Sequence, residues 1–280
     1  MKKGIFFALL YGAIFLLFFS MLAYYSQYGA DRSLLLQEGS RLRKFASIAD
    51  DVKTDLLGIL RINSISINRN STHAIISIDD NFPIAYSNPQ NELISYESYF
   101  EGPYAASQNL AENLQIDLNS IYGAPFLYFN GVNLNYSHSD LDKSSATFKG
   151  SNSIEKYSVF ILSDPADPIS SCAFSTQIAG DLELEIGIQS PNCPSQQVFL
   201  DPNPNSLFFA NTTSGKYLNV SIGFIDGSPN SIKISNLDGI KLNILLNATI
   251  STIQPITAWL PVGLEFNPDY ALSTLVIAEN

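Results

Sequence analysis

Few side chains in this sequence have the types and spacing that catalysis needs. Only two histidines occur, His73 and His138, and a hydroxyl–histidine–carboxylate site would have to use one of them. His73 directly follows Asn-Ser-Thr in an expected turn, which favours an exposed residue without a catalytic role. No HExxH, GxSxG, CxxC, Walker or GxGxxG pattern is present. The sequence therefore predicts a non-enzymatic protein that needs no cofactor.

Two acidic segments have residues that could bind a cation. His138–Asp142 offers one imidazole and two carboxylates, and Asp201–Asn205 resembles the opening of a calcium loop. Two prolines stiffen the second segment, and serine follows it where calcium loops need glycine. The pairs Asp79–Asp80 and Glu183 with Glu185 are expected on solvated faces rather than in a glycosidase site. We therefore predict no metal site.

The cysteines and glycosylation sequons indicate an oxidising compartment. Cys172 and Cys193 are the only cysteines, and 20 residues separate them. A disulfide between them is expected and would contribute about 3 kcal/mol, although two free buried thiols are the alternative. Five Asn-x-Ser/Thr sequons are candidate glycosylation sites, at Asn70, Asn135, Asn211, Asn219 and Asn247.

The charge distribution excludes one class of partner. The chain has a formal net charge of −11, and residues 63–280 hold 7 basic and 21 acidic side chains. Affinity for a phosphate backbone comes from dense lysine and arginine, so nucleic acid is excluded as a partner. An acidic surface suits cations or a basic partner, or simply keeps a domain in solution.

The N-terminal segment predicts a membrane anchor. Gly4–Ala30 contains no charged residue, and twenty apolar residues span the hydrocarbon core of a bilayer. We therefore predict a cytoplasmic tip over residues 1–4, a transmembrane helix over 5–24 and the lipid bilayer as a partner. Lysines at positions 2 and 3 predict a single-pass cell-membrane protein with its N-terminus in the cytoplasm and its head outside. A cleaved secretory signal is the competing interpretation.

The anchor is expected to continue as an amphipathic stalk helix over residues 25–62. Apolar side chains recur there at helical spacing, with charged residues on the opposite face. The apolar positions are Leu35, Leu42, Phe45, Ala49, Val52, Leu56 and Ile59. This stripe predicts contact with the head or with neighbouring copies in a homo-oligomer.

The remaining sequence predicts a β-rich head. A hairpin is expected after Asn63, and a helical insertion that Gly102-Pro103 bends or splits follows it. Alternating apolar and polar residues then predict antiparallel strands of a sandwich. The predicted fold class is α+β: a long transmembrane and stalk helix, then a sandwich-like head with a short helical insertion. We expect one part of the head over residues 63–200, and 201–280 as a separate sandwich or its later strands.

The N-terminus resembles that of archaeal type IV pilins and pilin-like proteins. Lys3-Gly4 before an uncharged apolar helix, an amphipathic continuation and a β-rich head match the plan of that family. The resemblance implies processing after Gly4 and packing of the apolar helix against pilin-like neighbours. Leu9 occupies the fifth mature position, where many pilins have glutamate, which favours a minor, tip or non-filament protein.

Two functions agree with these features. The first is a membrane-anchored structural or adhesive protein of the cell surface, pilin-like in plan. The second is a membrane-tethered recognition module that binds a glycan or a protein partner. A hydrolase with dispersed acidic residues is a more distant third.

Overall fold

The computed structural model describes residues 2–82, 89–108, 114–122, 126–139, 145–151, 153–201, 205–236, 238–266 and 270–279. Within these ranges, the side chains of residues 2–14, 25–35, 82, 89–90, 126 and 138–139 are not described. The chain divides into two compact parts, Met1–Asp50 and Asp51–Asn280. Helix α1 spans Lys2–Ile59, so its last turns belong to the second part.

The predicted fold class needs correction in its helical part. Among the residues whose side chains are described, strands account for 52% and helices for 23%, so this part of the protein is mostly β rather than α+β. The β-rich, sandwich-like part of the prediction is confirmed. Two sheets of six and nine strands form most of the second part.

The predicted transmembrane helix over residues 5–24, and with it the single-pass membrane localisation, is not supported. Among the described residues, no helix is both long enough and apolar enough to cross a membrane. The apolar run whose side chains are described extends from Phe15 to Tyr24.

The apolar stripe predicted for the stalk is buried only in its later part. Leu42 is 52% exposed, whereas Phe45, Val52 and Leu56 are buried. The side chain of Leu35 lies outside the described residues.

The short helical insertion follows the first hairpin of the head. It consists of α2 (Pro89–Tyr99), the π-helical turn η1 (Phe100–Tyr104) and α3 (Ala105–Ser107). Pro103 lies inside η1, where the sequence predicted a bend.

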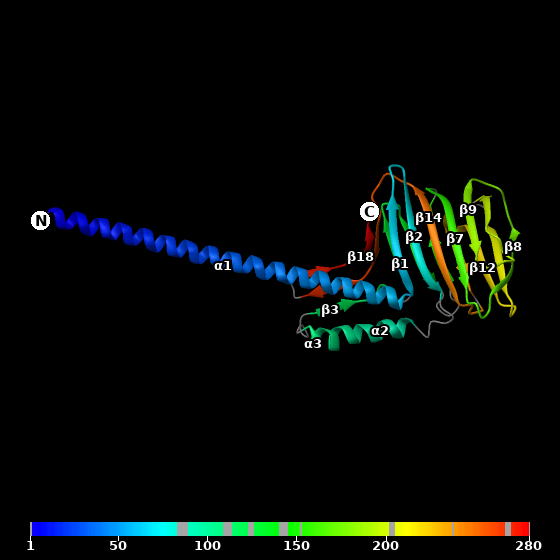
Figure 1. Cartoon of the computed structure of the whole chain (residues 1–280), viewed down its shortest axis with the longest axis horizontal. Coiled ribbons are helices and arrows are strands. Elements are labelled where there is room, and N and C mark those ends of the chain that lie inside the picture. Colours follow the sequence, from blue (N-terminus) through cyan, green and yellow to red (C-terminus); the bar gives the residue numbers. More distant parts are fainter. Residues whose placement is uncertain are drawn as a thin grey trace. The chain divides into compact units, whose positions relative to one another are not determined.

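The six-stranded sheet and the nine-stranded sheet are the two layers of the head (Figure 1). The first has the order β1 (Ile62–Arg69), β2 (His73–Phe82), β14 (Leu242–Ser251), β7 (Ile154–Ser163), β9 (Leu182–Ile188), β10 (Gln196–Leu200). The second has the order β18 (Leu275–Glu279), β15 (Thr257–Leu260), β4 (Phe126–Asn130), β5 (Leu134–Ser139), β6 (Ser145–Lys149), β13 (Ser228–Ser235), β12 (Tyr217–Ile225), β11 (Ser206–Thr212), β8 (Ile169–Thr176). A third, small sheet has the order β17 (Tyr270–Leu272), β16 (Gly263–Phe266), β3 (Leu114–Asp117).

Side chains from both sheets meet in one apolar core. Along β14, Leu242, Ile244, Leu246, Ala248 and Ile250 are all buried and alternate with more exposed residues, most of which are polar. The rings of Phe148 on β6 and Tyr157 on β7 meet edge to face across the layers, with centroids 5.9 Å apart. The Tyr157 hydroxyl also donates a 2.5 Å hydrogen bond to the carbonyl oxygen of Asn230. Because Tyr157 is fully buried, this bond satisfies a polar group that water cannot reach.

One feature of the topology differs from the predicted antiparallel sandwich. Strands β7 and β9 pair in parallel, because the chain crosses to β8 in the other sheet before it returns. Of the two alternatives given for residues 201–280, the described strands agree with the second, because the strands after residue 205 do not form a sandwich of their own. Strand β14 pairs with β2 and β7, and β13 pairs with β6, so residues 206–280 complete both sheets.

The last turns of α1 are built into the head. Val52 and Leu56 have no exposed surface, and Leu60 is 2% exposed. The Tyr104 hydroxyl donates a 2.6 Å hydrogen bond to the Asp51 carboxylate. The pKa of Tyr104 is raised well above its usual range, and the hydroxyl therefore keeps its proton. Burial is the largest cause of this rise, and the hydrogen bond to Asp51 is the second. These contacts join residues 51–60 to the helical insertion.

Shortening a buried side chain in residues 51–60 should destabilise the head. Leu56→Ala should lower the free energy of unfolding by about 2–5 kcal/mol, because a cavity would remain. Urea unfolding of the full chain, followed by the fluorescence of its single tryptophan, measures the change. Leu42→Ala removes the same atoms from an exposed position and should change stability by less than about 0.5 kcal/mol. Equal losses in both variants would show that residues 51–60 do not stabilise the head.

Candidate functional site

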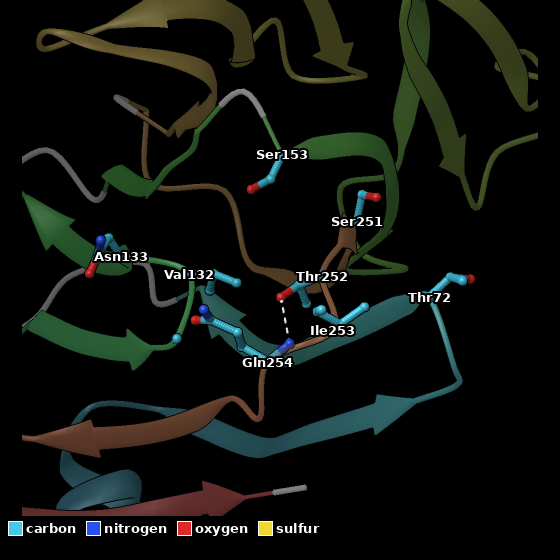
Figure 2. Close-up of a pocket in the computed structure, with 9 residues that line it drawn as sticks. Thr72, Val132, Asn133, Ser153, Ser251, Thr252, Ile253 and Gln254 are labelled. Atoms are coloured by element: carbon cyan, nitrogen blue, oxygen red, sulfur yellow. Dashed lines mark hydrogen bonds between the residues drawn. The ribbon is translucent and has the colours of Figure 1, made fainter.

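An open pocket of about 560 Å³ lies at one end of the sandwich (Figure 2). Four segments of the chain line it: the β1–β2 turn, the β4–β5 turn, the residue before β7 and the segment after β14. The lining residues are Thr72, Gly131, Val132, Asn133, Ser153, Ser251, Thr252, Ile253 and Gln254. The volume falls within the range that small-molecule sites occupy.

Backbone contacts fix the four segments against one another. The Thr252 amide donates to the Thr72 carbonyl at 3.1 Å, and the Ser251 amide donates to the Ser153 carbonyl at 2.9 Å. The Arg69 guanidinium donates to the carbonyl of Ile253. Gly131 has a φ of 91°, and a Cβ there would collide with the carbonyl oxygen of Pro255. The β4–β5 turn therefore packs closely against the segment after β14. Because the four segments contact one another directly, the pocket is preformed.

The chemistry of the lining is polar and uncharged. The pocket residues supply four hydroxyl groups, two side-chain amides and two aliphatic side chains. None of them carries a carboxylate, an ammonium or a guanidinium group. Without a titratable group, the lining offers no general acid or base and no charged metal ligand.

His73 lies beside the pocket in a chain of hydrogen bonds. Its Nε2 contacts the Glu155 carboxylate at 3.0 Å, and its Nδ1 contacts the Thr72 hydroxyl at 2.7 Å. This order resembles a catalytic triad, but the backbone amides of Thr72 and His73 both donate to Oδ1 of Asn70. These amides therefore cannot stabilise an oxyanion, and the Thr72 hydroxyl points away from the other pocket residues (Figure 2). We interpret the chain as support for the turn. His73 was predicted to be exposed, whereas the structure places it half-buried.

The two acidic pairs have different surroundings. Asp79 accepts hydrogen bonds from the side-chain amides of Asn63 and Asn243 at 3.1 and 2.9 Å. Asp80 is buried between the sheets, where it accepts a hydrogen bond from the Tyr136 hydroxyl of the opposite sheet. The sequence placed both residues on a solvated face, and for Asp80 this was wrong. Since side chains alternate along a strand, adjacent residues must face opposite sides.

Glu183 and Glu185 lie on the outer face of the six-stranded sheet and share one cation. The ammonium group of Lys156 is 2.7 Å from Glu183 and 3.1 Å from Glu185. Hydrogen bonds from Lys156 are the largest cause that lowers the pKa of both carboxyls. The same bonds raise the pKa of Lys156. This is an ion-paired surface cluster that links the parallel strands β7 and β9.

In the two segments considered as cation sites, Asp140 and Asp142 lie outside the described residues, as do residues 202–204 and the His138 side chain. Among the described residues, no group of three or more histidine, cysteine, aspartate or glutamate side chains could hold a metal ion. The side chains around Lys3-Gly4, the predicted processing site, also lie outside the described part. Processing there stays a prediction.

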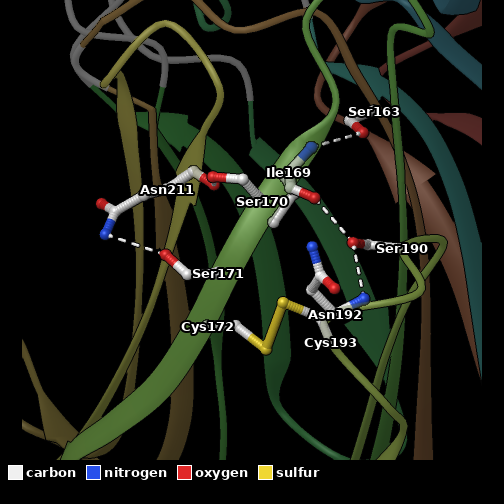
Figure 3. Close-up of a disulfide and its surroundings, with 9 residues drawn as sticks. All are labelled: Ser163, Ile169, Ser170, Ser171, Cys172, Ser190, Asn192, Cys193 and Asn211. Atoms are coloured by element: carbon white, nitrogen blue, oxygen red, sulfur yellow. Dashed lines mark hydrogen bonds between the residues drawn. A yellow bond between two sulfur atoms is a disulfide. The ribbon is translucent and has the colours of Figure 1, made fainter.

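The predicted disulfide between Cys172 and Cys193 is present (Figure 3). Their Cα atoms are 5.7 Å apart, and Cys193 is 1% exposed. Cys172 lies on β8 at the edge of the nine-stranded sheet, and Cys193 lies in the β9–β10 connection of the other sheet. Near the disulfide, the Ser190 hydroxyl donates a 2.6 Å hydrogen bond to the Ile169 carbonyl. The bridge therefore clamps the two sheets together at one edge.

The five sequons differ in accessibility. Asn70 is exposed in the β1–β2 turn, where its side-chain Oδ1 accepts hydrogen bonds and its side-chain amide nitrogen makes none within the turn. Asn211, Asn219 and Asn247 are half-buried within strands. Asn135 is half-buried on β5, and its Oδ1 is buried. Glycosylation stays a prediction at all five, and the geometry favours Asn70.

The sequence did not identify the loop-end pocket. Its residues lie in segments far apart in the chain, and none has a chemically distinctive side chain. The only available signal was the set of Ser/Thr/Asn-rich turns at the strand ends, which also describes ordinary loops.

Comparison with known proteins gave no match: no protein-family model, no curated protein and no solved structure is similar to this chain.

Loss of the disulfide should destabilise the head. Reduction, or the double change Cys172→Ala and Cys193→Ala, should lower the free energy of unfolding by about 3 kcal/mol, because the unfolded chain is no longer closed into a loop. Urea unfolding with and without reductant measures the loss. The Cys172→Ala and Cys193→Ala variant should not respond to reductant. Unchanged stability of the wild type after complete reduction would contradict the clamp.

The Lys156 cluster should make stability depend on pH. Because the pKa of Glu183 and Glu185 is lowered on folding, their contribution is present above the usual value of 4.5 and lost as the pH falls through the folded value. The raised pKa of Lys156 gives a contribution that is present below 10.5 and lost as the pH rises through the folded value.

On acidification from about pH 7 to about pH 3, the melting temperature of Lys156→Met should therefore decrease less than that of the wild type. The control is Lys216→Met, which removes a lysine that has no ion pair in the described part of the chain. Its acid profile should follow that of the wild type. Identical profiles for all three proteins would show that the cluster contributes nothing to stability.

Proposed function

We propose that this chain is a non-enzymatic structural or adhesive protein that acts outside the cytoplasm and assembles with copies of itself through α1. In this arrangement, residues 51–280 form the displayed head. The plan is the pilin-like one that the Lys3-Gly4 motif and the apolar N-terminus resemble.

The observation that carries this proposal is the exposed apolar segment of α1 between Phe15 and Tyr24. Eight large apolar side chains in this segment are more than half exposed, from Leu22 at 51% to Leu16 at 73%. They point in all directions around the helix, because they occupy consecutive positions. Soluble proteins rarely leave so continuous an apolar surface in contact with water.

Association between copies would bury this surface. Burial of one large apolar side chain contributes about 1.5–3 kcal/mol, and each copy offers eight. The entropic cost of association is about 4–15 kcal/mol. The free energy gained from burying five or more of these side chains therefore exceeds most of that range. A bundle of α1 helices would cover several sides of each helix at once, which a single binding groove would not.

Two further features support the proposal. The Cys172–Cys193 disulfide indicates an oxidising compartment, as expected for a protein that acts outside the cytoplasm. Within the described residues, the one arrangement that resembles a catalytic site, Thr72–His73–Glu155, has no adjacent free oxyanion donor. The first feature agrees with the proposed location, and the second agrees with a protein that binds or assembles.

A second candidate is a recognition module whose head binds a partner without assembly. The specific observation in its favour is the preformed loop-end pocket. The two candidates differ in whether α1 joins copies of the chain.

Charged substitutions in the apolar segment should abolish association. The full chain should form oligomers in sedimentation velocity, and the variant Phe18→Asp with Leu22→Asp should be monomeric. Both proteins should keep the same head stability in urea, since the substitutions lie outside residues 51–280. Gln37→Asp adds a charge to α1 beyond the apolar segment and should leave the oligomers intact.

Either of two results would contradict the proposal. One is a monomeric full chain, including a chain that is monomeric but bound to phosphatidylcholine vesicles. The other is an oligomer that survives both aspartate substitutions. In either case the recognition module becomes the better account.

A further inference from the structure

We propose that the loop-end pocket is a binding site for neutral saccharides. The pocket lies entirely within residues 51–280, so this inference does not depend on association through α1. It assigns a chemical class of ligand to a surface that the sequence did not identify.

The charges in and around the pocket favour an uncharged ligand. The head is strongly acidic, with 7 basic and 21 acidic side chains over residues 63–280. The pocket lining nevertheless contains no charged side chain. Two basic side chains contact residues of the lining: Arg69 donates to the Ile253 carbonyl, and the imidazole of His73 contacts Glu155 and Thr72. An anionic ligand would meet no free counter-charge there, and a cationic ligand would find more favourable surfaces elsewhere on the head.

Several polar groups of the pocket are available to a ligand. The side chains of Asn133, Ser251 and Gln254 are exposed and make no hydrogen bond in the described part of the chain. Each amide can donate two hydrogen bonds and accept two, and the hydroxyl can do both. This mixture matches the hydroxyl groups of a sugar, each of which both donates and accepts.

The pocket also offers an apolar contact. Ile253 is 75% exposed, the highest exposed fraction among the large apolar side chains of the described residues. Val132 lies on the opposite turn, and Gln254 extends toward it (Figure 2). Aliphatic side chains can cover the C–H faces of a pyranose ring while the surrounding hydroxyls and amides bind its edge.

The pocket is rigid enough to select a ligand. Hydrogen bonds join the Thr72, Ser153, Ser251 and Thr252 backbones, and the backbone amide of Gln254 donates to the Thr252 hydroxyl at 3.1 Å. The side chains available to the ligand therefore project from a fixed frame, which lowers the entropic cost of binding. Because the pocket is open and a monosaccharide is small, we expect a Kd of about 1–10 mM for a single sugar.

Saturation-transfer NMR on the full chain tests this inference, with glucose, galactose, mannose and N-acetylglucosamine as probes at about 10 mM each. At least one neutral sugar should receive saturation, and glucuronate should bind at least about tenfold more weakly because the head is acidic. The variant Asn133→Ala with Gln254→Ala should weaken binding about tenfold. Gln189→Ala, which removes an exposed amide outside the pocket, should bind as the wild type does.

The outcomes that overturn the inference are distinct. One is the absence of transfer to any of the four sugars, and another is equal affinity in the wild type and the double variant. A third is chemical-shift change at Asn133 and Gln254 with tetraglycine but with no sugar, which would assign the pocket to a peptide. Equal urea unfolding of the three proteins confirms that altered binding does not come from altered folding. None of these results depends on the oligomeric state, so this inference and the proposed function fail separately.

Discussion

The packing of the six-stranded sheet on the nine-stranded sheet is the interaction on which the rest of the head depends. Strand β14 shows this most clearly, since it pairs on both sides and all its inward side chains are buried. The ring contact between Phe148 and Tyr157, with the buried Tyr157–Asn230 hydrogen bond, fixes one layer against the other. Once the layers are fixed, the turns at their ends are brought together, and the loop-end pocket is a consequence.

The same burial requirement separates the two parts of the chain. In the head, apolar side chains alternate inward, and the disulfide closes one edge of the sandwich. Along α1, Val52 and Leu56 are fully buried, whereas the segment from Phe15 to Tyr24 is exposed. The chain thus has one surface whose apolar contacts are complete and another whose contacts are not. This contrast is why we assign assembly to α1 and recognition to the head.

The sequence predicted those features that depend on local periodicity or on a unique residue pair. Alternation identified β9, β12 and β14, and the isolated cysteines predicted the bridge. Features that depend on long-range topology were missed. The parallel pairing of β7 with β9 follows from a crossing between sheets, which a strand's own pattern does not record. The burial of Asp80 depends on Tyr136, which lies in the opposite sheet. The pocket, built from four separate turns, was beyond local inference for the same reason.

The most direct measurement of the central claim is the proximity of α1 segments from different copies. Ser20→Cys places a thiol within the apolar segment, and Ser40→Cys places one on an exposed position farther along the same helix. In the full chain, a short bis-maleimide linker should join copies through position 20 much more efficiently than through position 40. Cross-linking that is absent at position 20, or equal at both positions, would contradict assembly through the segment from Phe15 to Tyr24.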